Sequence, residues 1–204
     1  MKPRLMLTIV ALAIAPAAVS AHALDEYVQA LKIGVTSHRL ELQLALTPGI
    51  NVASEVLRHV DVDGDEVIST EEAKAYGRHV IADLAATLDG TAITLLLHRV
   101  EVPTSGDLRA GSGVIRIEAV AADAARPGEH RFVLRNKHLP TMSVYLANAL
   151  LPESRDVQIK RQSRDERQQT YLLDYEIGGD SSTPLAWMFV ASIALLGLVG
   201  GRML

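Results

Sequence analysis

Two neighbouring stretches decide the fold class: residues 27–35 read YVQALKIGV, and residues 40–47 read LELQLALT. In the second stretch leucine recurs at every other position, with Glu41 and Gln43 between. A period of two is that of a β-strand with one buried face. The stretch Thr36-Ser37-His38 between them suits a tight turn. The pair therefore predicts a β-hairpin that presents one apolar face to a core.

The same pattern continues along the chain. It predicts further strands at 91–102, 113–121, 130–136, 156–162 and 168–177, with turns at 105–107, 126–128 and 138–140. Residues 142–151 fit either a short helix or a further strand. Seven short strands with this punctuation favour a mainly β fold, an antiparallel β-sandwich of the immunoglobulin-like type.

One region, residues 51–88, breaks the period of two. Apolar residues recur at helical spacing within 51–60 and again within 71–88, and Asp89-Gly90 provides a stop signal. The sequence therefore predicts a helix–loop–helix inserted between the second and third strands.

The loop between these helices, residues 61–72, reads DVDGDEVISTEE and has the spacing of an EF-hand calcium loop. Calcium prefers six to eight oxygen ligands, and such a loop wraps them around one point. The spacing predicts six ligand residues: Asp61, Asp63, Asp65, Val67 through its backbone carbonyl, Ser69 and Glu72. A turn that binds no ion is the alternative, but four carboxylates would then repel one another in one turn.

Two positions of the loop depart from the usual pattern. Position 6, normally glycine because the backbone takes a positive φ there, is Glu66, so we expect a weakened site. Ile68 occupies position 8, which pairs with a second loop in paired EF-hands, and no second loop of this spacing occurs in the sequence.

The two ends of the chain predict export and membrane anchoring. Residues 1–21 have the charged start, apolar stretch and small residues of a signal peptide, with cleavage after Ala21 or Ala23. Residues 184–201 carry no charge and are followed by Arg202, so 184–204 is predicted to be a transmembrane helix. The domain at 22–180 would then face the periplasm from the inner (cytoplasmic) membrane.

Composition excludes several classes of function. The chain has 204 residues, a formal net charge of −4 and no cysteine. A nucleic-acid surface needs clustered positive charge, and disulfides or a cysteine nucleophile need thiols. No nucleophile elbow or phosphate-binding glycine loop accompanies a strand, so we expect no enzymatic activity.

Several stretches resemble a family of exported proteins: residues 22–30 (HALDEYVQA), 46–49 (LTPG), the loop itself, 136–140 (NKHLP) and 143–152 (SVYLANALLP). The layout is similar to the periplasmic N-terminal region of HupE/UreJ-like proteins, in which a multi-span nickel/cobalt-permease-like part follows. This chain ends after one predicted span. The resemblance therefore implies at most an accessory role beside a separate permease.

Histidine offers one further metal site in the sequence. If cleavage follows Ala21, the amine and imidazole of His22 form a terminal chelate for copper or nickel. The other histidines form no HxH or HxxxH pair, and His59 and His79 are expected to be solvated.

Three functions follow from these expectations. The first is a membrane-anchored calcium-binding module that supports an interaction with an envelope protein. The second is an accessory module for nickel, cobalt or copper that uses His22. The third is an adhesion or scaffold domain whose loop binds nothing.

Overall fold

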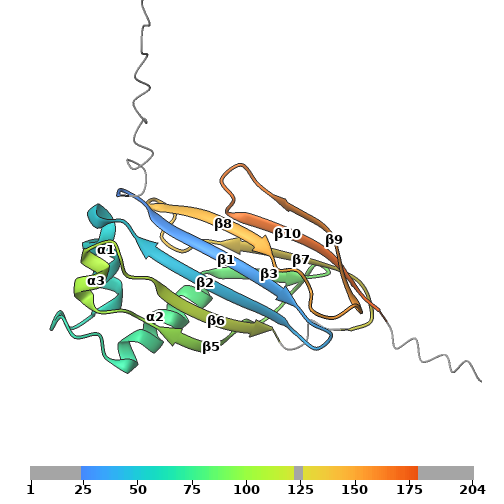
Figure 1. Cartoon of the computed structure of the whole chain (residues 1–204), viewed down its shortest axis with the longest axis horizontal. Coiled ribbons are helices and arrows are strands. Elements are labelled where there is room, and N and C mark those ends of the chain that lie inside the picture. Colours follow the sequence, from blue (N-terminus) through green and yellow to red (C-terminus); the bar gives the residue numbers. More distant parts are fainter. Residues whose placement is uncertain (1–23, 122–125, 179–204) are drawn as a thin grey trace, which may run out of the picture.

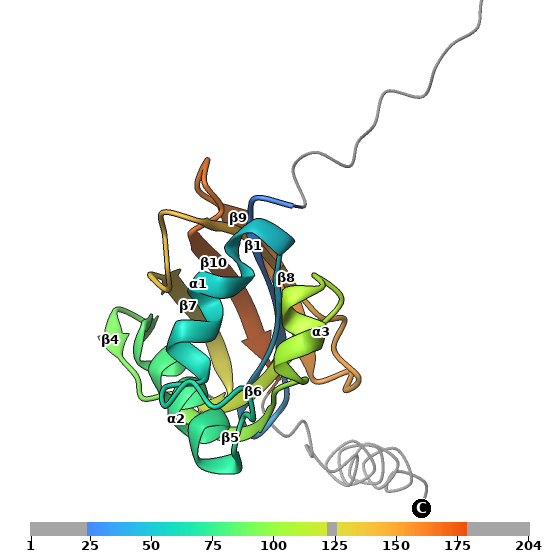
Figure 2. The same ribbon diagram turned by 90° about the vertical axis from the view of Figure 1, so that its left-hand side faces the viewer.

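A computed structural model describes residues 24–121 and 126–178 (Figures 1 and 2). The predicted signal peptide, His22 and the predicted transmembrane segment at 184–204 lie outside these ranges. Within the described ranges, no helix is both long and apolar enough to cross a membrane.

Within the described residues, ten strands form two five-stranded sheets. The first sheet has the order β5 (Leu96–Glu101), β6 (Ile115–Ala121), β2 (Leu40–Pro48), β1 (Tyr27–Val35) and β8 (Ser143–Ala149). The second has the order β4 (Thr91–Ala92), β3 (Leu84–Leu88), β7 (Gly128–Asn136), β10 (Thr170–Ile177) and β9 (Val157–Arg164).

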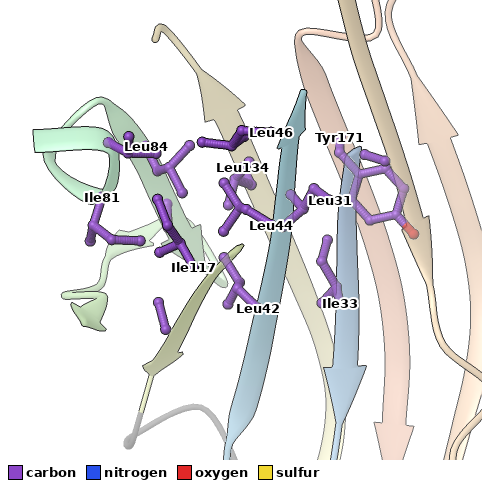
Figure 3. Close-up of a cluster of buried hydrophobic side chains, with 14 of the residues drawn as sticks. Leu31, Ile33, Leu42, Leu44, Leu46, Ile81, Leu84, Ile117, Leu134 and Tyr171 are labelled. Atoms are coloured by element: carbon purple, nitrogen blue, oxygen red, sulfur yellow. The ribbon is translucent and has the colours of Figure 1, made fainter. Parts of the chain in front are cut away.

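The two sheets face each other across one hydrophobic core (Figure 3). Leu42 and Ile117 enter it from the first sheet, and Leu134 and Tyr171 enter it from the second. Along β1, β2, β6 and β10 every second side chain is buried, as the period of two predicts. The expectation of a mainly β fold with two packed sheets is thus confirmed.

Three helices lie together at one end of the sandwich: α1 (Ile50–Val60), α2 (Thr70–Ala82) and α3 (Ser105–Arg109) (Figure 2). The predicted insertion between the second and third strands is present as α1 and α2. Helix α2 packs closely on β5, because Gly77 leaves room there for the side chains of Leu97 and Val100.

The second helix is shorter than the range of 71–88 that the sequence predicts. It ends at Ala82, and residues 84–88 form β3. Leu84 and Ala86 are buried, and β3 pairs with β7 over its whole length. The hydrogen bonds to β7 decide the conformation, although alanine and leucine in this stretch favour a helix.

The strand predicted at 91–102 is two strands in different sheets. β4 pairs with β3 in the second sheet, and β5 pairs with β6 in the first, so the chain crosses between the sheets at residues 93–95. In addition, the turn predicted at 105–107 is the start of α3, whose N-cap is Thr104.

The prediction of a purely antiparallel arrangement is wrong at one place. β1 pairs with β8 in parallel, with Tyr27 opposite Ser143, while every other strand pairing within the described residues is antiparallel. Residues 142–151, which fitted either a helix or a strand, contain the strand β8.

Candidate functional site

The predicted calcium loop connects α1 to α2 at the helical end of the sandwich. Asp61 is the C-cap of α1, and its amide donates to the carbonyl of Leu57. Ser69 is the N-cap of α2, where its hydroxyl accepts from the Glu72 amide while the Glu72 carboxylate accepts from the Ser69 amide. This reciprocal capping box fixes the start of α2.

The three aspartates of the loop lie together. One carboxylate oxygen from each of Asp61, Asp63 and Asp65 lies within 4.8 Å of the others. Asp61 is buried, and its two oxygens accept from the amides of Gly64 at 2.9 Å and Glu66 at 3.1 Å. The backbone of the loop therefore wraps around the first aspartate.

Glu72 reaches back across the loop from the first turn of α2. Its Oε1 accepts from the Val62 amide at 2.8 Å, and its Oε2 accepts from the Ser69 amide at 2.9 Å. The hydrogen bonds from Ser69, followed by that from Val62, lower the pKa of Glu72 to about 2. The carboxylate is therefore charged at any physiological pH.

Position 6 has the backbone conformation that normally calls for glycine. Glu66 has φ 69°, a left-handed conformation that side chains other than glycine adopt at a cost of about 1 kcal/mol. Contacts from α3 hold the residue there: Ser105 Oγ donates to the Glu66 carbonyl at 2.9 Å, and Arg109 lies 3.1 Å from its carboxylate.

The position-8 residue has a partner inside the domain. Ile68 packs against the hydrophobic core and lines a groove of about 970 Å³ between α2 and β5. The neighbouring Val67 is 68% exposed, and because its side chain is a hydrocarbon, only its backbone carbonyl is a candidate ligand. In place of a second loop, Ile68 therefore packs against the core of the domain itself.

All six predicted ligand residues belong to this loop, with the three aspartates on one side and Glu72 approaching from α2. The Val67 amide donates to Asp65 Oδ1 at 2.8 Å, which ties the middle of the loop to the third aspartate. The Ser69 hydroxyl donates to Glu72 Oε2 at 2.8 Å.

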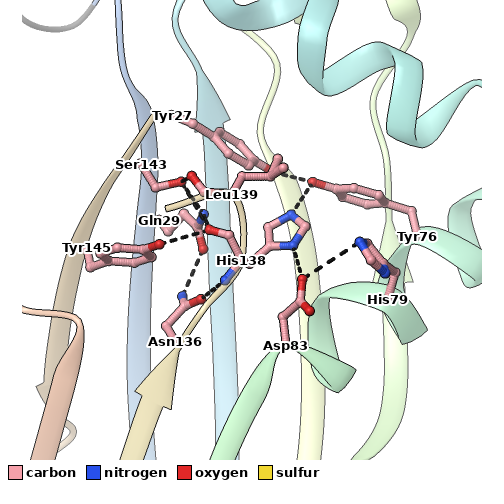
Figure 4. A network of polar contacts seen from close by, with 10 residues as sticks. All are labelled: Tyr27, Gln29, Tyr76, His79, Asp83, Asn136, His138, Leu139, Ser143 and Tyr145. Atoms are coloured by element: carbon pink, nitrogen blue, oxygen red, sulfur yellow. Dashed lines mark hydrogen bonds and ion pairs between the residues drawn. The ribbon is translucent and has the colours of Figure 1, made fainter. Parts of the chain in front are cut away.

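A second cluster, which sequence reasoning missed, joins His79 and Asp83 of the α2 segment to His138 after β7 (Figure 4). His138 Nδ1 lies 2.8 Å from Asp83 Oδ2, and His79 Nε2 lies 3.7 Å from the same oxygen. The His138 side chain is fully buried. The pKa of His138 is lowered, because the effect of burial outweighs that of the Asp83 carboxylate, which raises it.

Two tyrosines complete the surroundings of the His138 ring. Its Nε2 lies 3.0 Å from the hydroxyl of Tyr76, which in turn lies 2.6 Å from the hydroxyl of Tyr27 (Figure 4). If His138 carries its proton on Nδ1, it donates to Asp83 and accepts from Tyr76. Both ring nitrogens are thus satisfied in the interior.

The backbone around His138 is held just as firmly. Its carbonyl accepts from Gln29 Nε2 and from the Tyr145 hydroxyl, each at 2.9 Å, and its amide donates to the Asn136 side chain at 2.9 Å. The next residue, Leu139, has φ 44°, a conformation that costs a bulky side chain about 1–2 kcal/mol. The network fixes this strained turn, and with it the direction of the imidazole.

The sequence contained a signal for this cluster that spacing alone did not reveal. Three of the stretches on which the expected family resemblance rests, 22–30, 136–140 and 143–152, supply Gln29, Asn136, His138 and Tyr145. They are far apart in the chain and meet around one imidazole. His79 and Asp83 are also one helical turn apart, which places them on one face.

The chain matches no protein-family model, no curated protein and no solved structure.

Proposed function

We propose that this protein is a non-enzymatic calcium-binding module, with an EF-hand loop at residues 61–72 inserted in an immunoglobulin-like sandwich. The observation that supports it most is the cluster of the Asp61, Asp63 and Asp65 carboxylates in a twelve-residue loop whose last residue, Glu72, is bonded back to Val62. Because Glu72 belongs to α2 and Asp61 ends α1, an ion held between them links the two helices.

The donor set suits calcium. Calcium–oxygen distances of about 2.3–2.6 Å place opposite ligands roughly 5 Å apart, and the three aspartate oxygens lie within 4.8 Å of one another. Every candidate donor is oxygen, which a hard cation prefers. Magnesium demands a tighter octahedral geometry and loses its water less readily, so calcium should bind in preference.

Calcium would act on the surface beside the loop. Ile68 is in the loop and also lines the groove between α2 and β5, which includes Ala73 and Ile81 of α2 and Leu97 of β5. An ion that fixes the loop therefore fixes one wall of this groove. We propose that the groove serves the interaction with an envelope protein.

The proposed setting is the periplasmic face of the inner membrane, with 184–204 as the anchor. Calcium outside the cytoplasm suits a weak site, with a Kd on the order of 10⁻⁴–10⁻³ M as in extracellular modules. The glutamate at position 6 is consistent with that range, because strain in the loop lowers affinity.

Calorimetric titration of the purified protein tests this function. We expect calcium binding with a Kd below about 1 mM, and a rise in melting temperature relative to protein in chelator. Glu72→Gln should abolish both effects, since it removes the closing charge and one bidentate ligand. Glu71→Gln is the matched control, because Glu71 is adjacent, exposed and paired with Lys74 rather than directed into the loop. Equal binding by Glu72→Gln and wild type would overturn the proposal.

A further inference from the structure

The cluster of His79, Asp83 and His138 carries an inference that is independent of the calcium loop. We propose that these three side chains form a second metal site, specific for a divalent first-row transition ion such as Zn²⁺, Ni²⁺, Co²⁺ or Cu²⁺. The ligand atoms are His79 Nε2, one Asp83 carboxylate oxygen and His138 Nδ1. Figure 4 shows the three side chains directed toward one another.

The distances fit such an ion. Metal–nitrogen and metal–oxygen bonds of about 2.0–2.2 Å place tetrahedral ligand atoms roughly 3.4 Å apart. The observed separations from Asp83 Oδ2 are 2.8 Å to His138 and 3.7 Å to His79, on either side of that value. All three ligand atoms lie within 4.8 Å of one another. Small movements of the Asp83 carboxylate therefore suffice to admit the ion.

The donor set also separates this site from the calcium loop. Two imidazole nitrogens and one carboxylate suit borderline transition ions, whereas calcium and magnesium prefer oxygen alone. The protein thus has two sites of different selectivity, one of oxygens and one mainly of nitrogens. They lie at opposite ends of α2, because Glu72 is in its first turn and Asp83 is its C-cap.

The site is rigid on one side and open on the other. His138 is fully buried and held through its backbone and its Nε2 atom. The His79 side chain is 54% exposed, so an ion can enter from solvent and keep water at its remaining position. Ordered ligands on one side and solvent access on the other are what a reversible binding site needs.

Tyr76 is a positioning residue for the site. When a metal takes Nδ1 of neutral His138, the ring proton is on Nε2, which then donates to the Tyr76 hydroxyl 3.0 Å away. Metal-bound histidines generally donate their second N–H to such a partner, and loss of the partner weakens binding by about 10- to 100-fold. The hydrogen bond between Tyr76 and Tyr27 would reverse its direction on binding.

A matched pair elsewhere in the fold provides the control. His130 Nδ1 lies 2.8 Å from Asp89 Oδ2, which reproduces the His138–Asp83 contact. Within residues 24–121 and 126–178, no third ligand joins His130 and Asp89 in a metal-binding group. A histidine–aspartate pair alone should not bind the ion tightly.

The experiment is a Zn²⁺ titration of the full-length protein by calorimetry, in saturating calcium so that the loop is already occupied. We expect one ion per chain, with affinity reduced about 100-fold or more in His79→Ala and in Asp83→Asn, and unchanged in His130→Ala. His79 and Asp83 are both partly exposed, so these variants should fold, and a cooperative thermal melt without added metal verifies this. Tyr76→Phe should weaken binding by about 10- to 100-fold.

Replacement of Zn²⁺ by Co²⁺ adds a direct readout. A cobalt ion bound by two imidazoles should give a visible absorption band that His79→Ala removes and His130→Ala retains. Zinc binding that persists unchanged in both His79→Ala and Asp83→Asn would place the ion elsewhere, for example at His22, and would overturn the proposal. A failed calcium titration would leave this result unaffected, since the two sites share no ligand.

Discussion

Glu72 Oε1 accepts a hydrogen bond at 2.8 Å from the amide of Val62, so the twelfth residue of the loop is tied to the second. The same carboxylate caps α2 through Ser69. A single side chain therefore closes the loop and starts the helix, and its length matters as much as its charge.

Shortening this side chain tests that relationship. Glu72→Asp retains the charge, but its carboxylate lies one methylene closer to α2 and cannot serve both Val62 and Ser69. We expect the calcium Kd to rise at least about tenfold, because bidentate closure is lost. Calorimetry measures this, with Glu71→Asp as the control. An unchanged Kd would show that charge alone determines the affinity.

Relief of the backbone strain at position 6 should have the opposite effect. Glu66→Gly removes the cost of φ 69° and should stabilise the folded loop by about 1 kcal/mol. Loss of the exposed pair with Arg109 costs little. Glu66→Ala loses that pair but keeps the strain, so it separates the two effects. In chelator, the urea midpoint of Glu66→Gly should be higher than that of Glu66→Ala. Calcium titrations should likewise show tighter binding by Glu66→Gly.

The contact between α2 and β5 leaves little room for a methyl group at Gly77. A Cβ added at Gly77 would lie 3.2 Å from Leu97 Cδ2 and 3.3 Å from Val100 Cβ. Alanine favours a helix by about 1 kcal/mol, but overpacking costs about 1–3 kcal/mol. Gly77→Ala should therefore give no stabilisation and a net loss of about 1 kcal/mol. Gly106→Ala in α3 has more space, its nearest neighbour being 3.8 Å away, and serves as the comparison in a thermal melt.

The second sheet contains an ion pair that should make stability depend on pH. Arg131 in β7 donates to both oxygens of Asp174 in β10, at 2.7 and 3.1 Å, and this holds the pKa of Asp174 below its ordinary value. The unfolded chain therefore takes up a proton first as the pH falls. The stabilisation is complete above about pH 4, and it is lost as the pH falls through the lower folded-state pKa.

Urea unfolding between pH 7 and pH 2.5 measures this effect. Asp174→Asn should lose stability at pH 7 and show a flatter acid decline than the wild type. Arg131→Gln should flatten the decline in the same way. A decline as steep in both variants as in the wild type would assign the acid sensitivity to other carboxylates.

The predicted ends of the chain can be tested in cells. We expect the mature protein to remain in membranes after a carbonate wash, with residues 24–178 accessible to protease added from the periplasmic side. Deletion of 184–204 should release a soluble periplasmic domain. Recovery of that truncated protein in the cytoplasm, with its leader intact, would contradict the proposed location.

The elements that the sequence predicted correctly are those whose signals are local. β1 and β2 bury every second side chain, so their period is visible without knowledge of their partners. The signal for a loop at 61–72 between two helices is also local, because its candidate ligands follow one another over twelve positions, and its calcium binding stays a prediction. β3 was missed because residues 84–88 continue a helical pattern, and only pairing with β7 makes them a strand.

The cluster of His79, Asp83 and His138 was missed because its members are distant in the chain. His138 and Asp83 are 55 positions apart, and the contact depends on where β7 ends relative to α2. The helical spacing of His79 and Asp83 is visible in the sequence, but such a pair does not identify which distant residue would be the third ligand. The strained turn at Leu139, which directs His138, has no signature in a single sequence.

The parallel pairing of β1 with β8 sets the order in which the chain can fold. Gln29 in β1 donates to Ser143 at the start of β8, across 114 positions of sequence. During synthesis or translocation β1 emerges early, yet one of its edges stays open until residues 143–149 arrive. Open strand edges invite pairing with other chains, and distant pairings are slow to form. A nascent chain of this protein therefore carries an exposed edge for most of its synthesis, and a chaperone that covers residues 27–35 would protect it from aggregation.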